Sequence, residues 1–280
     1  MKSYMKAREI AGALRKAGIE EAEREAEEIL CHVLGVDRTA LYVLDPEVPD
    51  IKYRLVTELI KRRTGREPLQ YLLGEVEFYG LRIKVGRGVL IPRPETEILV
   101  ETLIGETAKR FSARFTALDL CTGSGCIAIA IGKAFPRASV SGVDLSSVAL
   151  GFALANREAN CVDNVSFASG NLFEPVDSAA AFDVIVSNPP YVPQDDLKTL
   201  QPEIRLYEPM EALDGGEDGL SFYRRIIGQA PRYLNPGGLL FLEMGAGQGV
   251  KIKEMALASG FKSVLIKKDY AGIERIVIID

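Results

Sequence analysis

Apolar residues follow different spacings along the chain, and the changes in spacing divide it into regions. In the first 74 residues apolar positions recur every three or four residues, with breaks at Gly18 and Gly35, and a further helix is predicted for 51–63. Between residues 78 and 91, apolar and polar residues alternate around glycines, as in a β-hairpin. These patterns predict an N-terminal helical domain over 1–74 and a β-hairpin linker over 75–92.

From residue 93 the chain alternates apolar strands with helices. Pro92-Arg93-Pro94 leads into the first helix, whose first turn carries acidic residues. The later helices are predicted at 127–135, 147–159, 220–234 and 250–258. The strands are predicted at 116–120, 139–143, 165–168, 182–187 and 238–243, and near residues 264 and 276. This alternation predicts an α/β domain over 93–280 with a mostly parallel seven-stranded sheet.

A loop of small residues joins the predicted strand 116–120 to the next helix. Gly123 and Gly125 allow the backbone to approach a ligand closely, and the helix start offers free N–H groups. About 20 residues later the next strand ends in Asp144, a position from which a carboxylate accepts hydrogen bonds from a ribose. The glycine spacing alone fits a dinucleotide site equally well.

The sequence Asn188-Pro189-Pro190-Tyr191 follows the predicted strand 182–187. The prolines restrict the backbone, so the Asn188 side-chain oxygen and the Pro189 carbonyl form a nearly fixed pair of acceptors that suits one planar NH2 group. The aromatic ring of Tyr191 offers a face for a planar group. A simple strand-ending turn is the alternative, but the upstream loop and Asp119 favour S-adenosylmethionine (SAM) as the ligand and this motif as the site of the group to be methylated.

The motifs, taken in order, resemble those of the PrmC/HemK family, the N5-glutamine methyltransferases of peptide-chain release factors. The resemblance spans essentially the whole chain. Its motifs are Arg66-x-Pro68-x-Gln70-Tyr71-x-x-Gly74, Ile91-Pro92-Arg93-Pro94-Glu95-Thr96-Glu97, Thr122-Gly123-Ser124-Gly125, Gly142-Val143-Asp144-Leu145-Ser146, Asn188-Pro189-Pro190-Tyr191, Tyr207-Glu208-Pro209 and Gly215-Gly216-x-Asp218-Gly219-Leu220.

The resemblance implies a class I SAM-dependent methyltransferase fold with an antiparallel strand in the last pair, and methyl transfer to the glutamine of the Gly-Gly-Gln motif in class 1 release factors. The helical domain would then help to recognise the release factor. The implied catalytic residues are Asn188, Pro189, Pro190 and Tyr191, and the same four with Arg93, Pro94 and Glu95 would bind substrate. The implied cofactor-binding residues are Asp119, Cys121, Thr122, Gly123, Ser124, Gly125, Asp144, Leu145, Asn171, Leu172 and Asn188.

Two residues depart from the family pattern. Cys121 stands where the loop commonly begins with glycine, and Asn171 stands where an aspartate often faces the adenine. An asparagine is both donor and acceptor, so it is still able to bond an adenine edge.

Charge and cysteine content limit the other possibilities. The formal net charge is −5 and the isoelectric point about 5.3, which disfavours a stable nucleic-acid partner and the alternative of an N6-adenine nucleic-acid methyltransferase. A noncatalytic SAM-binding or dinucleotide-binding protein would leave the N-P-P-Y motif without a purpose.

The four cysteines form no C-x-x-C pair and predict neither a disulfide nor a metal site. No apolar stretch predicts a membrane span or a signal peptide, so a cytoplasmic protein is expected.

Overall fold

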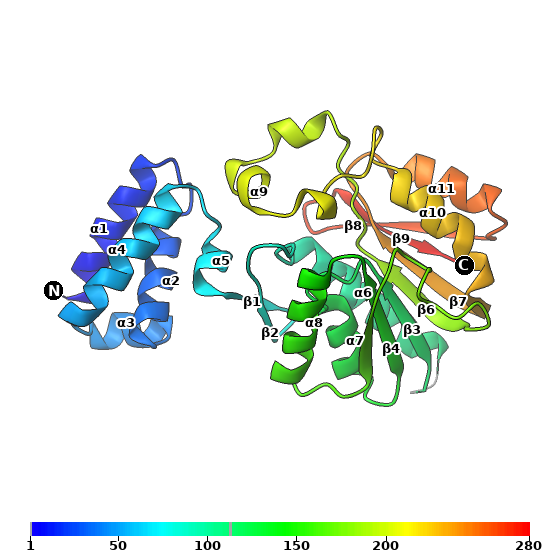
Figure 1. The fold of residues 1–280 in the computed structure, drawn as a ribbon, viewed down its shortest axis with the longest axis horizontal. Coiled ribbons are helices and arrows are strands. Elements are labelled where there is room, and N and C mark those ends of the chain that lie inside the picture. Colours follow the sequence, from blue (N-terminus) through cyan, green and yellow to red (C-terminus); the bar gives the residue numbers. More distant parts are fainter. Residues whose placement is uncertain (1, 112–113) are drawn as a thin grey trace. The chain divides into compact units, whose positions relative to one another are not determined.

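The computed structural model describes residues 2–111 and 114–280, which form two compact units. The first unit is Met1–Gly74 with Gln201–Tyr207, and the second is Glu75–Leu200 with Glu208–Asp280. Figure 1 shows the helices and strands of each unit. No helix among the described residues is long and apolar enough to cross a membrane.

The N-terminal helices of the first unit pack around one apolar cluster. The helices of this unit are α1 (Ser3–Lys16), α2 (Ala22–Leu34), α3 (Arg38–Leu44), α4 (Asp50–Thr64), α5 (Leu69–Leu73) and α9 (Pro202–Tyr207). Ile10, Leu14, Ile29 and Leu30 are fully buried in the cluster, at the helical spacing that the sequence shows. Helix α2 ends where Gly35 adopts a left-handed conformation (φ 72°), which glycine tolerates without strain.

Helix α9 joins this unit from far along the chain. The guanidinium groups of Arg63 and Arg66 donate to the two carboxylate oxygens of Glu203, at 3.0 and 2.8 Å. The Tyr207 hydroxyl also donates to the carbonyl of Gly65 at 2.8 Å. The sequence predicted one domain over 93–280, whereas the structure groups Gln201–Tyr207 with the helical unit. Ion pairs between residues about 140 positions apart leave no periodic pattern in the sequence, so this grouping was not predicted.

The second unit contains a twisted seven-stranded sheet with the strand order β5-β4-β3-β6-β7-β9-β8. Its strands are β3 (Thr116–Leu120), β4 (Ser139–Asp144), β5 (Val165–Ser169), β6 (Phe182–Ser187), β7 (Leu234–Glu243), β8 (Val264–Lys268) and β9 (Glu274–Ile279). Strand β9 pairs antiparallel with both β7 and β8, whereas the pairs among β3 to β7 are parallel. This is the mostly parallel class I methyltransferase fold expected from the sequence.

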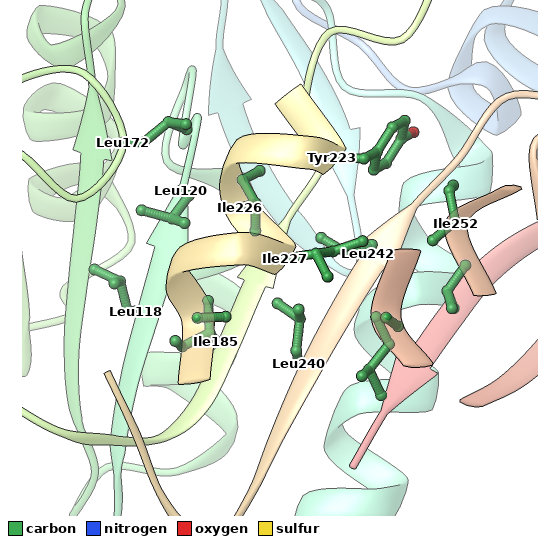
Figure 2. Packing of buried hydrophobic residues seen from close by; sticks show 14 of the residues in the cluster. Leu118, Leu120, Leu172, Ile185, Tyr223, Ile226, Ile227, Leu240, Leu242 and Ile252 are labelled. Atoms are coloured by element: carbon green, nitrogen blue, oxygen red, sulfur yellow. The ribbon is translucent and has the colours of Figure 1, made fainter. Parts of the chain in front are cut away.

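Helices cover both faces of this sheet. They are α6 (Pro94–Arg110), α7 (Cys126–Ala134), α8 (Ser147–Ala159), α10 (Ser221–Gln229) and α11 (Gly249–Ala258), with short 3-10 turns at Asp196–Thr199, Met210–Ala212 and Ala230–Arg232. Figure 1 shows α6, α7 and α8 on one side of the sheet and α10 and α11 on the other. In Figure 2, Ile226 and Ile227 of α10 lie over Leu118, Ile185 and Leu240 of the sheet. Alternate strand residues face this layer, as the pleat requires.

The predicted helix over 220–234 was wrong at its C-terminal end. Helix α10 stops at Gln229, a 3-10 turn covers Ala230–Arg232, and β7 already begins at Leu234. Pro231 explains the change, because it lacks the N–H group that an α-helix would use at that position.

The hairpin is shorter than the predicted linker. Strands β1 (Glu75–Phe78) and β2 (Leu81–Lys84) pair antiparallel, and Tyr79 and Gly80 both have positive φ, as in a two-residue hairpin turn. The side chain of Asn156, on α8, accepts from the Lys84 N–H at 2.7 Å and donates to the Lys84 carbonyl at 3.1 Å. These bonds attach the hairpin to α8 within the second unit.

The packing of α10 on the sheet gives a stability prediction. Ile227 is fully buried, so Ile227→Ala leaves a cavity and should lower the free energy of unfolding by about 2–5 kcal/mol. Leu257→Ala on α11 removes a side chain that is 48% exposed and should change it by less than about 0.5 kcal/mol. Chemical denaturation of both variants measures the difference, and equal effects would contradict the packing described.

Candidate active site

The loop after β3 has the backbone shape of a ligand-binding turn. Cys121, Gly123 and Gly125 all have positive φ, at 58°, 56° and 78°. Glycine is required at Gly125, because a Cβ there would lie 2.9 Å from the ring of Phe167. A Cβ at Gly123 would meet nothing within 4 Å. Cys121 holds its left-handed conformation with a side chain, an arrangement that is uncommon for residues other than glycine.

Asp119 ties the two ends of this loop together. It is fully buried, and its Oδ2 accepts hydrogen bonds from the Thr122 hydroxyl and from the Ala128 N–H in the first turn of α7. Burial raises the pKa of Asp119 to about 7, and the two hydrogen bonds act in the opposite direction. The other oxygen, Oδ1, is buried without a hydrogen-bond partner among the described residues.

Asp144 lies at the carboxyl end of β4, beside the glycine loop. Its Oδ2 accepts from the Gly123 N–H at 2.8 Å, and its Oδ1 accepts from the Ser146 N–H at 2.9 Å. Burial raises the pKa of Asp144, while these backbone hydrogen bonds lower it. Each carboxylate oxygen has a second lone-pair site, so both remain able to accept from a ligand hydroxyl.

Asn171 and Leu172 follow β5 on the same edge of the sheet. The Asn171 side-chain oxygen accepts from the Arg225 guanidinium at 2.7 Å, which leaves its NH2 group as the free end of the amide. Leu172 has a left-handed backbone (φ 58°) and is buried. Arg225 comes from α10 and was not expected from the sequence.

Asn188 follows the central strand β6. Its NH2 group donates to the Thr96 hydroxyl at 3.1 Å. The opposite end of the amide, Oδ1, accepts no hydrogen bond from the described residues, and neither does the Pro189 carbonyl. The Ser187 hydroxyl donates to the Leu120 carbonyl at 2.7 Å and so joins the tips of β6 and β3. Two acceptors without a hydrogen bond from the described residues thus belong to consecutive residues at the carboxyl end of β6.

A buried carboxylate lies behind this motif. Glu243, the last residue of β7, accepts from the Thr96 hydroxyl at 2.7 Å and from the Tyr191 hydroxyl at 3.4 Å. Burial raises the pKa of Glu243 to about 7, and burial also raises the pKa of Tyr191. Thr96 and Glu243 were not expected as functional residues from the sequence. Glu243 does end an apolar run at a strand's carboxyl end, the same signal that identified Asp144.

Gln248 holds the backbone that follows the motif. Its NH2 group donates to the carbonyls of Tyr191 and Gly219, at 3.0 and 3.2 Å, and its oxygen accepts from the Gly245 N–H at 2.9 Å. The glycine-rich segment near residue 219 is therefore attached to the N-P-P-Y motif.

These strand ends surround one cavity of about 670 Å³ within the second unit. Of the residues expected to bind cofactor or substrate, the cavity is lined by Cys121, Thr122, Gly123, Ser124, Asp144, Leu145, Asn171, Leu172, Asn188 and Pro190. Asp119, Gly125, Pro189 and Tyr191 do not line it, although hydrogen bonds or the chain connect them to residues that do. The cavity therefore gathers residues from loops that are far apart in sequence.

Arg93, Pro94 and Glu95 also lie outside the cavity lining, whereas Pro92 and Thr96 line it. Arg93 bonds the carboxylate of Glu208, which also accepts from the Ile91 N–H at 3.1 Å. Glu208 is buried, so this pairing fixes the start of α6 beside the site. The expected substrate-binding role of the three residues stays a prediction.

The cysteines near the loop give a prediction about reactivity. Burial raises the pKa of the Cys121 thiol, and it raises that of Cys126 to about 12, so neither thiol forms the reactive thiolate near neutral pH. Cys161 is exposed. We expect iodoacetamide at pH 8 to alkylate Cys161 first, with peptide mass spectrometry as the measurement; faster labelling of Cys121 would contradict the raised pKa of its thiol.

Comparisons with known proteins agree with this geometry. Residues 7–74 match the family described as PrmC N-terminal domain, and residues 94–204 match the one described as methyltransferase small domain. A 16S rRNA methyltransferase of T. thermophilus, solved in complex with AdoMet and guanosine, superposes with a TM-score of 0.54 at 18% identity, covering 74% of this chain and 49% of that one. This likeness shows the fold.

Full-length relatives show the family. The release factor glutamine methyltransferase of Thermodesulfovibrio yellowstonii is 50% identical over 256 residues, covering 91% of each chain. The protein of the same name from Geobacter sulfurreducens is 46% identical, covering 95% of this chain and 92% of that one. The chain therefore belongs to the release factor glutamine methyltransferase family, whose members are SAM-dependent enzymes.

Proposed function

We propose that this protein transfers a methyl group from SAM to the side-chain amide nitrogen of the glutamine in the Gly-Gly-Gln motif of class 1 release factors. The observation that carries the proposal is the orientation of Asn188. Its NH2 group is bonded to Thr96, so its oxygen and the neighbouring Pro189 carbonyl are left as acceptors. Two acceptors match the two N–H bonds of a primary amide. The names of the relatives support glutamine as that amide.

The residues around the cavity suit SAM. The volume of about 670 Å³ lies in the range typical of small-molecule sites. Asp144 keeps lone pairs for two ribose hydroxyls, Gly123 leaves open space beside the loop, and the buried Asp119 keeps the loop in shape. When bound, SAM supplies the electrophilic methyl group.

The protein's own groups would hold and activate the amide. An amide nitrogen is a weak nucleophile because its lone pair is delocalised. Asn188 and Pro189 would fix the NH2 group and so orient its nitrogen toward the methyl group. Holding both reactants in this geometry makes the bimolecular step effectively unimolecular. As the nitrogen is alkylated its N–H bonds become more acidic, so the same two acceptors bind the transition state more strongly than the ground state.

We assign release-factor recognition to the helical unit. The match of residues 7–74 to the PrmC N-terminal domain supports this role. The unit has its own apolar core, so it is able to present a surface independently of the methyltransferase site.

Incubation with radiolabelled SAM tests the proposed substrate. We expect label on a class 1 release factor and none on the same factor with its Gly-Gly-Gln glutamine replaced by alanine. Duplex DNA is the third acceptor, and we expect it to stay unlabelled at low and high salt. Label on adenine with none on the release factor would replace the proposal by a nucleic-acid methyltransferase.

A further inference from the structure

Glu243 is a buried charge-bearing group that the mechanism above does not use. It is only 1% exposed, at the end of β7, where Ile276 of β9 is its strand partner. A buried carboxylate costs stability unless it is paired and hydrogen-bonded. Its two hydrogen bonds go to Thr96 and Tyr191, both next to or within the motif that would hold the substrate amide.

We propose that Glu243, acting through the Thr96 hydroxyl, sets which end of the Asn188 amide faces the cavity and so is a positioning residue for methyl transfer. This inference rests on the proposed function for its effect on catalysis. Its structural part, the orientation of Asn188, is independent of the substrate.

The orientation of Asn188 follows from the donors and acceptors around the Thr96 hydroxyl. An ionised carboxylate only accepts hydrogen bonds, so the Thr96 hydroxyl must donate its single proton to Glu243. The Thr96 oxygen then has only lone pairs to offer, and it accepts from the NH2 end of Asn188. The oxygen of Asn188 is consequently the end that remains for the substrate amide.

Protonation of Glu243 would remove this constraint. A protonated carboxyl is able to donate to the Thr96 oxygen, and the Thr96 proton is then free to bond the oxygen of Asn188. The amide would turn over and present its NH2 group to the NH2 group of the substrate. Two donors facing each other hold no amide nitrogen in place.

The surroundings of Glu243 place this change near neutral pH. Burial is the main cause that raises the pKa of Glu243 from 4.5 to about 7, and the charge of Glu95 on α6 also raises it. The hydrogen bonds from Thr96 and Tyr191 and the charge of Arg275 on β9 lower this pKa. The other neighbouring groups are Tyr223 of α10, whose hydroxyl donates to the Glu243 carbonyl at 2.9 Å, and the thiol of Cys126. The active, ionised form is therefore lost as pH falls through about 7.

Glu243→Gln is the main variant, since it keeps the size of the side chain and replaces one acceptor oxygen with an NH2 group, which donates to the Thr96 oxygen and frees the Thr96 proton for the oxygen of Asn188. At pH 8 we expect the single-turnover rate of methyl transfer to fall about 10–100-fold, by analogy with residues that orient a functional ligand. The KM for release factor and the affinity for SAM should change less than twofold. The acid limb of the wild-type pH profile, with a midpoint near 7, should disappear. Glu254→Gln, an exposed change on α11, is the matched control and should behave as wild type.

Thr96 variants and a double-mutant cycle separate positioning from general structural damage. Thr96→Val removes the hydroxyl and should match Glu243→Gln, while Thr96→Ser keeps it and should stay near wild type. In an Asn188→Ala background, Glu243→Gln should cause no further loss. The inference would be overturned if the rate losses of Asn188→Ala and Glu243→Gln multiplied in the double variant. It would also be overturned if Glu243→Gln and Thr96→Val both had wild-type rates.

Two measurements need no methyl transfer. The side-chain NH2 resonance of Asn188, assigned by its absence in Asn188→Ala, should shift with a midpoint near pH 7 in the wild type and not in Glu243→Gln. A wild-type resonance that is independent of pH would overturn the inference even if the substrate proposal holds. A raised pKa means that the ionised form of Glu243 is unfavourable in the folded protein. The Tm of Glu243→Gln at pH 8 should therefore equal or exceed that of the wild type.

If the wild-type protein fails to label release factor, that result would refute the proposed function but not the orientation of Asn188.

Discussion

Replacing Asn188 by alanine is expected to slow methyl transfer to the release factor by about 10²–10³-fold, as when one preorganised hydrogen-bond partner is lost. The side chain supplies one of the two acceptors for the substrate NH2 group, and the Pro189 carbonyl remains. Asn188 also lines the cavity. Its NH2 group is bonded to Thr96 and its oxygen is assigned to the substrate amide, so we expect the affinity for SAM to change little. Single-turnover kinetics and calorimetry measure the two quantities separately.

Asn188→Asp is the sharper variant of the same position. It keeps an acceptor of the same size but loses the N–H bond to Thr96, and it puts a second carboxylate near Glu243. We expect it to be impaired as well, with SAM affinity retained. Rates near wild type in both variants would show that the N-P-P-Y sequence is only a turn.

Asp144→Ala should weaken SAM binding by about 10²-fold or more. Two charge-assisted hydrogen bonds to ribose hydroxyls are lost, and each is worth roughly 1.5–3 kcal/mol. The structure adds that Asp144 also accepts from the backbone of Gly123 and Ser146, so the alanine variant should lose some stability too. Asp144→Asn retains one acceptor and should lie between the wild type and the alanine variant.

The control for this prediction is Asp163→Ala, which removes an exposed aspartate of the same unit. Titration calorimetry on each variant, after a thermal melt has shown that it is folded, gives the SAM affinity. Unchanged affinity in a folded Asp144→Ala protein would remove Asp144 from the cofactor site.

Much of the fold could be predicted because its elements have clear local signals. The bounds of β3, β6 and α8 were predicted to the residue, since an apolar run or a helical period ends abruptly at each. The end of α10 was missed because α-helical periodicity continues past Gln229, while Pro231 interrupts the backbone hydrogen bonds. Local periodicity says nothing about which hydrogen bonds a proline removes.

The candidate site was predictable only in part, for a similar reason. Asp144 and Asn188 were identified because each follows a predicted strand, and parallel strands bring such ends to one edge of the sheet. Thr96 and Glu243 are 147 residues apart, and their contact depends on how α6 packs beside β7. Arg225 likewise reaches Asn171 from a helix 54 residues later. Only the three-dimensional structure joins such pairs.

The proposed methyl acceptor is one glutamine side chain of a release factor. The most direct test is tandem mass spectrometry of a class 1 release factor, purified without its methylation and incubated with this protein and SAM. We expect one added methyl group, located by fragmentation on the side-chain amide of the Gly-Gly-Gln glutamine and absent when the Asn188→Ala protein is used for the same short time. An unmodified glutamine, or methyl groups placed on other residues, would contradict the proposed function.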